Sequence, residues 1–275
     1  MRDIDRRWVF LCVAAALVLT VLFPFSQPIT PSPSVVGVYE FIEKLPPGSV
    51  VLISTDYDPE AGAELVPITD ALLAHCFRRN IRVVGMTFWP TGSPLGKGLF
   101  ERMGKQYGKV SGTDYVYLGT KPGGMAQVIT NMAESFASAF PKDANDKPTM
   151  TMPIFKEAHS LRDVDYIIGL AAGDTTGGWV IYAGDKYRVP TAAGCTGVIG
   201  PDLYVYTNTG QLNGIIAGLR GGADYEVLLK EPGKAVSAMP AQSTVHALII
   251  VFVIVGNVLY FASRRAARRV EEGPR

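Results

Sequence analysis

Residues 49–55 read SVVLIST, an unbroken run of aliphatic and β-branched residues. Such a run predicts a strand buried on both faces, as the strands of parallel sheets are. The residues that follow, 60–79, carry apolar side chains at helical spacing and predict an amphipathic helix. Residues 81–88 (IRVVGMTF) then predict a second strand, so the chain begins to alternate between strand and helix.

The alternation extends in both directions from this stretch. We expect further helices at 35–45, 96–107, 123–140 and 211–229 and further strands at 114–119 and 165–172; residues 179–187 fit either state, and 189–198 fit a strand or a loop. Strands that alternate with helices of this length form right-handed βαβ units around a parallel sheet. The expected fold class is therefore α/β, a three-layer domain that is Rossmann-like or flavodoxin-like.

Two uncharged apolar segments flank this domain, residues 8–25 and 245–262. Each has about eighteen residues, near the lower end of the length that spans a bilayer as a helix. Basic residues lie outside both segments and favour the cytoplasm for both chain ends; they are Arg6, Arg7, Arg264, Arg265, Arg268 and Arg269. A signal peptide would also explain the first segment, but Pro24 and Pro28 stand where its cleavage site would lie.

The chain is expected to form a two-pass protein of the inner or cytoplasmic membrane, with its central domain periplasmic or extracellular. The segments are a cytoplasmic tail (1–7), a transmembrane helix (8–25), a proline-rich linker (26–34), the α/β domain (35–236), a second linker (237–244), a transmembrane helix (245–262) and a basic cytoplasmic tail (263–275). A polar break at 141–153 either separates two domains or caps an excursion at the sheet's edge.

The charge balance excludes one class of partner. Between Gln27 and Thr244 the chain holds 18 basic and 21 acidic residues, although the whole chain has a net charge of +1. A slightly acidic domain argues against nucleic-acid binding, which needs a concentrated basic face. The arginines of the C-terminal tail either only set the orientation or also contact anionic lipids.

Ligands of open parallel sheets bind beyond the carboxyl ends of the strands, where four polar loops are expected here. The candidate ligand-binding residues in these loops are Asp56, Asp58, Thr91, Ser93, Lys121, Gly123, Asp174 and Thr175. Lys121 beside two glycines suits an anion, and Asp56 with Asp58 suits a divalent cation. Helix capping and tight turns explain the same residues without a ligand. The chain lacks the phosphate-loop and dinucleotide patterns, so we predict no cofactor and no metal.

Nucleophilic catalysis has little support in the sequence. Neither G-x-S-x-G nor H-E-x-x-H occurs. His75 and Cys76 are neighbours on a helix, so their side chains point about 100° apart. Cys195 has small neighbours, which suit either an exposed nucleophile or a packed strand end. Cys76 and Cys195 are also candidates for a disulfide in an oxidising compartment.

Three residues are candidates for contacts between subunits. Gly214 and Gly218 are four residues apart in the expected helix 211–229, where they allow close approach either within the domain or between copies. Asn257 is a polar residue inside the second apolar segment. It suits a hydrogen bond to another membrane helix, or it is solvated near the membrane's edge.

Residues 210–212 (GQL) and 218–226 (GLRGGADYE) resemble an uncharacterised prokaryotic group of membrane proteins. Those proteins place a similar α/β domain between two membrane helices. The resemblance implies the same topology and no known activity.

The leading functional prediction is a non-enzymatic membrane scaffold, or subunit of a complex, whose α/β domain self-assembles or docks another membrane protein. One alternative is a ligand-sensing or solute-binding accessory of a transporter that uses the strand-end loops. The second is a membrane-tethered hydrolase that uses Cys195 or the Asp56 and Asp58 pair.

Overall fold

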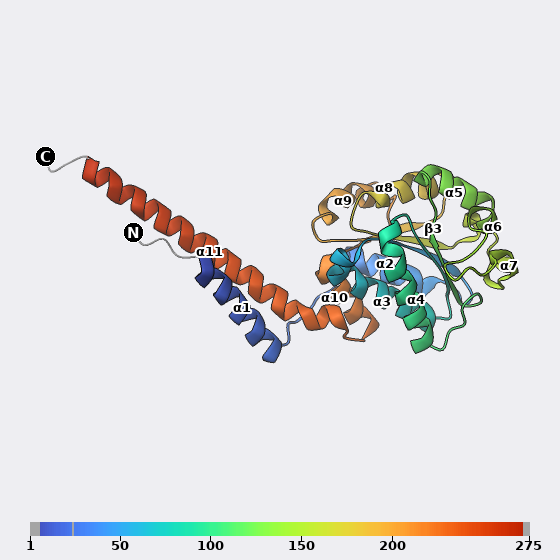
Figure 1. The fold of residues 1–275 in the computed structure, drawn as a ribbon, viewed down its shortest axis with the longest axis horizontal. Coiled ribbons are helices and arrows are strands. Elements are labelled where there is room, and N and C mark those ends of the chain that lie inside the picture. Colours follow the sequence, from blue (N-terminus) through green and yellow to red (C-terminus); the bar gives the residue numbers. More distant parts are fainter. Residues whose placement is uncertain (1–5, 24, 272–275) are drawn as a thin grey trace. The chain divides into compact units, whose positions relative to one another are not determined.

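The structure, a computed structural model, describes residues 6–23 and 25–271, with side chains to residue 265. The chain divides into two compact units, Met1–Pro28 with Ser237–Arg275, and Ile29–Val236. The second unit is an α/β domain built on a parallel sheet of six strands (Figure 1). Residues 141–153 lie inside this unit, as an excursion and not as a boundary between domains.

The strand order identifies the type of sheet. The strands are β1 (Val50–Asp56), β2 (Arg82–Thr87), β3 (Tyr115–Thr120), β4 (Tyr166–Ala171), β5 (Thr191–Cys195) and β6 (Ile215–Ala217). Their order is β3-β2-β1-β4-β5-β6, and every pairing is parallel. This order is that of Rossmann-type sheets, in which the direction of winding reverses between β1 and β4. The predicted Rossmann-like α/β fold is confirmed, and the flavodoxin-like order is not found.

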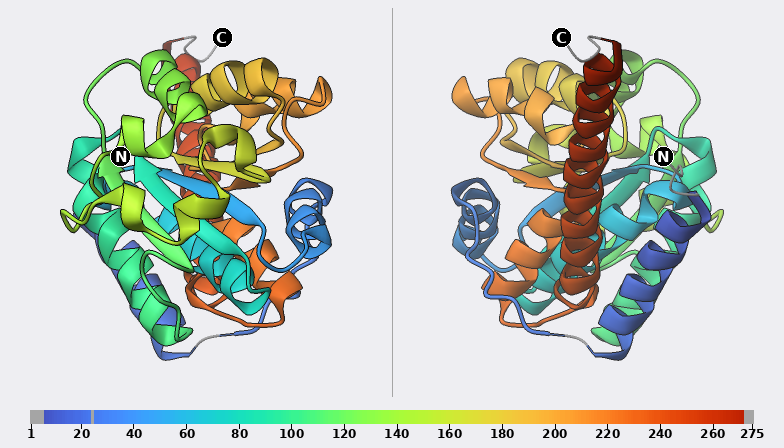
Figure 2. Two further views of the ribbon diagram at one scale, coloured as in Figure 1. Left: turned by 90° about the vertical axis from the view of Figure 1, so that its right-hand side faces the viewer. Right: turned by 90° about the vertical axis from the view of Figure 1, so that its left-hand side faces the viewer.

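Helices cover both faces of the sheet (Figure 2). One layer contains α2 (Pro33–Lys44), α3 (Gly62–Arg78), α4 (Ser93–Gln106) and α10 (Gly218–Leu229). The other face is covered by α5 (Met125–Glu134), α6 (Phe136–Ala139), α7 (Ile154–Glu157), α8 (Thr175–Trp179), the π-helix η5 (Val180–Asp185) and α9 (Gly200–Asn208). All seven residues of β1 are buried, as expected of a central strand with a helical layer on either side.

The remaining short elements are 3-10 turns: η1 (Pro59–Ala61), η2 (Pro90–Gly92), η3 (Thr149–Thr151) and η4 (Leu161–Asp163). The ambiguous residues 179–187 are mostly helical, in η5. The helix expected at 123–140 is interrupted by Ser135, whose extended backbone separates α5 from α6 and whose side chain accepts a hydrogen bond from the N–H of Ser138.

The glycine-rich segment 211–229 is not one helix, and the predicted subunit contact at its two glycines is wrong. Gly214 precedes β6, and Gly218 begins α10 with a φ of +62°. A Cβ at Gly214 would lie 2.1 Å from the carbonyl oxygen of Ser34. Both glycines are buried inside the domain, so they serve local packing.

A buried carboxylate of α10 fixes the N-terminal end of the domain. Asp224 accepts hydrogen bonds from the backbone N–H of Ser32, at 3.0 Å, and from Nε of Arg220, at 2.8 Å. Arg220 also donates to the carbonyl of Thr30. The end of the predicted linker 26–34 is therefore fixed to the domain just before α2 begins.

A second carboxylate of α10 fixes the C-terminal end of the domain. Glu226 is buried and accepts hydrogen bonds from the backbone N–H groups of Gly233, Ala235 and Val236, at 2.8–2.9 Å. These groups lie at the start of α11 (Lys234–Glu271), where helical N–H groups lack partners in their own helix. The second linker predicted at 237–244 is wrong, because α11 continues through it as one helix.

Within the described residues, one helix is long and apolar enough to span a membrane. It covers Lys234–Arg265 of α11; the most apolar part of this helix has a mean hydropathy of 2.4 and no residue buried inside the protein. The first-unit helix α1 (Arg6–Leu22) has 17 residues, short of the about 20 that usually span the hydrocarbon core. The structure therefore does not establish α1 as a second span. Arg2 and the side chains of Arg268 and Arg269 lie outside the described residues.

Candidate functional site

The expected ligand site lies at the carboxyl edge of the sheet, beside β1 and β4, where the direction of winding reverses. Asp56 ends β1 there, but it is fully buried. Its carboxylate accepts hydrogen bonds from the backbone N–H of Phe88, at 2.6 Å, and from the hydroxyls of Ser54 and Thr87, at 2.7 and 3.3 Å. Burial raises the pKa of Asp56, and these hydrogen bonds oppose that rise. Asp56 thus joins β1 to the β2 loop and is closed to a ligand.

Asp58 does not act together with Asp56. Its carboxylate turns to the hydroxyl of Thr91, which donates to it. The two carboxylates expected to bind a cation therefore have separate partners: Asp56 is bonded in the interior, and Asp58 is bonded to Thr91 near the surface. Among the described residues, no group of three or more His, Cys, Asp or Glu side chains is placed to hold a metal ion.

The indole ring of Trp89, in the loop after β2, lies against the loop after β4. A Cβ at Gly173 would lie 2.8 Å from the ring of Trp89, so that ring packs directly on the loop after β4. Asp174 is exposed on the same loop. Thr175 starts α8, and the side chain of Trp179 at the end of that helix is buried. These predicted residues support the local structure and do not line an open site.

An open groove lies beside this region, at the end of the edge strand β3. It has a volume of about 770 Å³ and is formed by the start of α4, the end of β3 and the loop after α6. We call it the lysine groove; it is lined by Pro90, Ser93, Pro94, Lys97, Leu118, Gly119, Thr120, Lys121, Ala139, Phe140, Pro141, Lys142, Asp143 and Ala144. Of the residues predicted from sequence, Ser93 and Lys121 meet here. Gly123 lies outside it, in an exposed turn with a φ of +132°.

The groove's charged groups come from three separate segments. Lys97 donates from Nζ to the carbonyl of Ala144, at 3.2 Å. Lys142 pairs with Asp146 at 3.6 Å, and both side chains are exposed. Lys121 makes no hydrogen bond or ion pair among the described residues. Three lysines and one acidic residue, Asp143, therefore line the groove.

The acidic residue of the groove, Asp143, is 6% exposed. Its Oδ1 accepts hydrogen bonds from the backbone N–H groups of Asn145 and Lys147, at 2.8 and 2.9 Å. Its Oδ2 is buried and has no partner among the described residues. A buried oxygen of this kind costs free energy until a donor reaches it.

Sequence reasoning missed Lys97, Lys142 and Asp143. One signal was available, because Lys97 follows Ser93 by four residues and so lies on the same face of α4. Lys142 and Asp143 come to the groove through a contact between distant segments. The loop after α6 is held there because the N–H of Ala144 donates to the carbonyl of Tyr117 in β3. A single sequence carries no sign of that contact.

The cysteines are not placed for catalysis. Cys76 and Cys195 are buried and unpaired, as is expected of small apolar core residues. Burial raises the pKa of each thiol to about 12, which keeps both protonated at neutral pH. The predicted hydrolase nucleophile at Cys195 and the disulfide between Cys76 and Cys195 are not found.

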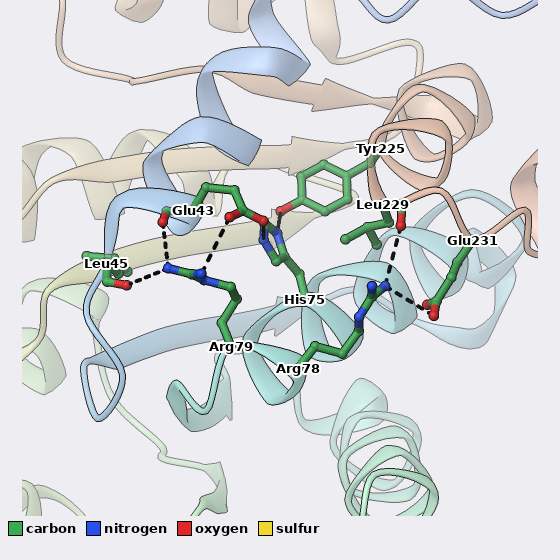
Figure 3. Close-up of polar contacts among 8 residues, drawn as sticks. All are labelled: Glu43, Leu45, His75, Arg78, Arg79, Tyr225, Leu229 and Glu231. Carbon is green, nitrogen blue, oxygen red and sulfur yellow. Dashed lines mark hydrogen bonds and ion pairs between the residues drawn. The ribbon is translucent and has the colours of Figure 1, made fainter.

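His75 has a structural role in a group of side chains that we call the His75 cluster; Figure 3 shows its members except Tyr39. The cluster comprises Tyr39, Glu43, His75, Arg79 and Tyr225. His75 Nε2 lies 3.0 Å from Glu43, Nδ1 lies 2.7 Å from the hydroxyl of Tyr225, and the ring stacks on Tyr39 at 4.7 Å. Because a carboxylate only accepts, Nε2 carries the proton and Nδ1 accepts from Tyr225.

The cluster ties together three helices, α2, α3 and α10. Arg79 donates to the carbonyls of Glu43 and Leu45, which fixes the end of α2. Burial lowers the pKa of His75 to about 4, against the opposing pull of Glu43. The imidazole is therefore neutral at physiological pH, and its two nitrogens are both satisfied.

Asn257 is exposed on α11, and its amide donates to the carbonyl of Val253 in the same helix. Its predicted contact with another helix stays a prediction. Within the first unit, the hydroxyl of Thr20 in α1 donates to that of Thr244 in α11, at 3.3 Å.

No protein-family model and no curated protein matches the chain. Two solved structures resemble it in part at 10% sequence identity. One is a trehalose-6-phosphate synthase, with a TM-score of 0.34, and it matches 87% of this chain and 45% of its own. The other is titled trehalose-6-phosphate from E. coli bound with UDP-2-fluoro glucose, with a TM-score of 0.33, and it matches 87% of this chain and 46% of its own. The chain thus spans less than half the length of either.

This comparison contradicts the predicted non-enzymatic scaffold, because the first structure is by name a synthase and hence an enzyme. We do not retain the scaffold as a function. With TM-scores below 0.5, the likeness transfers neither an activity nor a substrate to this chain.

Proposed function

We propose that the α/β domain binds a small molecule in the lysine groove and does so while tethered to a membrane. The observation that carries the proposal is the groove itself, an open space of about 770 Å³ at the carboxyl edge of a parallel sheet. Ligand pockets usually measure about 300–1,000 Å³ and lie at this edge in α/β folds. The lining of the groove also combines apolar residues with a few charged ones, as binding sites do.

The membrane part of the proposal is a two-pass topology, with α1 and α11 both spanning and both tails cytoplasmic. Its support is the apolar side chains that α1 exposes, such as Phe10, Val21 and Leu22, each more than 60% exposed. Water would penalise that surface, whereas lipid would not. Arg6, Arg7, Arg264 and Arg265 would then remain on the cytoplasmic side. The resemblance to prokaryotic proteins with two membrane helices agrees with this arrangement.

Binding is tested on the full chain in nanodiscs by thermal shift and calorimetry, with nucleotides, sugar phosphates, neutral sugars, carboxylic acids and amino acids as probes. Stabilisation by at least one class is expected. Ser93→Trp should abolish it by filling the groove. Gly98→Trp is the matched control on α4, because Gly98 is exposed with open space around it. If no class stabilises the wild type, or Ser93→Trp binds like the control, the groove is not a ligand site.

Topology is tested by placing a cysteine at the exposed Asn208 in a chain that has Cys12 replaced by alanine. A membrane-impermeant maleimide should label this cysteine in spheroplasts. Labelling that requires permeabilised membranes would place the domain in the cytoplasm and overturn the orientation.

A further inference from the structure

We infer that the ligand of the lysine groove is a phosphate monoester of a polyhydroxylated molecule. This inference rests on the proposed function and adds the chemical class of the ligand. It follows from the opposite charges that meet in the groove, those of the lysine ammonium groups and of the Asp143 carboxylate.

The positive groups favour an anion with several oxygens. Lys97, Lys121 and Lys142 reach the groove from α4, from the loop after β3 and from the loop after α6. Lys97 has only a neutral carbonyl as partner, and the partner of Lys142 is exposed, where an ion pair contributes little. The amino groups thus remain available for a ligand. Lysine is a common point-charge partner of phosphate.

The start of α4 adds to this field. Ser93 and Pro94 line the groove as the first residues of a 14-residue helix, and no side chain caps that end. The positive end of the helix dipole therefore faces the groove. The hydroxyls of Ser93 and Thr120 are further donors close to the same space.

Asp143 selects among anions. Its buried Oδ2 lacks a hydrogen-bond donor and carries negative charge, so it disfavours a bare anion beside it. A ligand hydroxyl close to the phosphate would donate to this oxygen and satisfy it. A phosphorylated polyol supplies an anion and a separate hydroxyl donor beside it from one molecule, whereas inorganic phosphate has only its own P–OH as a donor and a neutral sugar has no anion.

The test measures binding of glucose 6-phosphate, inorganic phosphate and glucose to the full chain in phosphatidylcholine nanodiscs. Glucose 6-phosphate should bind most tightly. Lys121→Met and Lys97→Met should each weaken it about tenfold, the loss of one charge-assisted hydrogen bond. Lys105→Met, on an exposed part of α4 outside the groove, should bind like the wild type. Asp143→Asn should reduce the preference for glucose 6-phosphate over inorganic phosphate, with its melting temperature measured as a check on folding.

The outcomes separate this inference from the proposed function. Equal binding of glucose and glucose 6-phosphate, with silent lysine variants, overturns the phosphate class but leaves the groove as a ligand site. Tighter binding of inorganic phosphate than of the sugar phosphate overturns the role of Asp143. Failure of every probe class in the wild type removes the proposed function itself.

A last arm identifies the source of the phosphate monoester. Phosphatidylinositol 4-phosphate in the nanodisc will compete with glucose 6-phosphate if the natural ligand is a lipid headgroup. Absence of competition, with glucose 6-phosphate still bound, assigns a soluble ligand. Both results support the phosphate class.

Discussion

The His75 cluster and the lysine groove use similar side chains in opposite ways. In the cluster, both imidazole nitrogens have partners, and Arg79 is bonded to two carbonyls and a carboxylate. In the groove, Lys121 has no partner among the described residues and a buried oxygen of Asp143 accepts nothing. The bonds of the cluster join three helices, although Nε of Arg79 has no partner among the described residues, whereas the free groups of the lysine groove are placed where a ligand fits.

The largest expected effect tests whether a buried, hydrogen-bonded carboxylate of α10, that of Glu226, stabilises the fold. Glu226→Ala removes the acceptor of three backbone N–H groups, which leaves buried donors without partners. We expect the free energy of unfolding to fall by about 3–5 kcal/mol, measured by denaturant unfolding. Glu231→Ala, which removes an exposed ion pair with Arg78, should cost less than about 1 kcal/mol. Equal losses in the two variants would show that burial of the bonds is not what matters.

The next effect is a dependence of stability on pH. The pKa of His75 is about 4 in the folded protein and 6.5 for an unperturbed histidine, so the unfolded chain binds more protons between these values. The stabilisation is therefore complete above pH 6.5 and is lost as the pH falls toward 4, by about 3 kcal/mol in total.

His75→Gln should flatten that dependence, because the amide does not titrate. Unfolding would be measured at several pH values between 4 and 7 for both proteins. His159→Gln is the control, since His159 is exposed, and it should keep the wild-type slope. A wild-type slope in the His75 variant would contradict a buried, neutral imidazole.

A smaller effect tests whether the ring of Trp89 fills the space beside Gly173, in the loop after β4. Gly173→Ala would place a methyl group 2.8 Å from the indole ring, and we expect a loss of about 1–2 kcal/mol. In a Trp89→Ala background the same change should cost nothing measurable. If the two changes are simply additive in a double-mutant cycle, the ring does not close this space.

The smallest effect on stability is expected in the groove. Lys121→Met should change the free energy of unfolding by less than about 0.5 kcal/mol without ligand, because the amino group contacts no described partner. Thermal unfolding of the free protein measures this directly. A loss of 2 kcal/mol or more would make Lys121 part of the fold and would remove its contrast with His75.

The sequence predicted the first half of the domain well, because its signals are local. Residues 49–55 and 81–88 are apolar runs that form a buried strand wherever two helical layers enclose them, and they correspond to β1 and β2. β6 was missed because it has three residues and adjoins Gly214 and Gly218, whose spacing imitates a helix. The strand order, too, results from packing between distant segments.

The site was predicted less well, for a related reason. The loop positions after β1 to β4 could be located, but burial decides their roles: Asp56 is fully buried, whereas Lys121 is half-buried and lines the groove. Asp143 became a site residue only through the contact of its loop with β3. Such contacts join residues that are distant in the chain, and no spacing rule reports them.

The two ends of the α/β domain are bonded to the same helix. Ser32 is held by Asp224, and Gly233 to Val236 are held by Glu226, one helical half-turn further along α10. A pulling force applied between the two chain ends therefore passes through α10 and these bonds, over a short path. None of the residues in these bonds lines the lysine groove, so tension in the tethers is applied away from the ligand site.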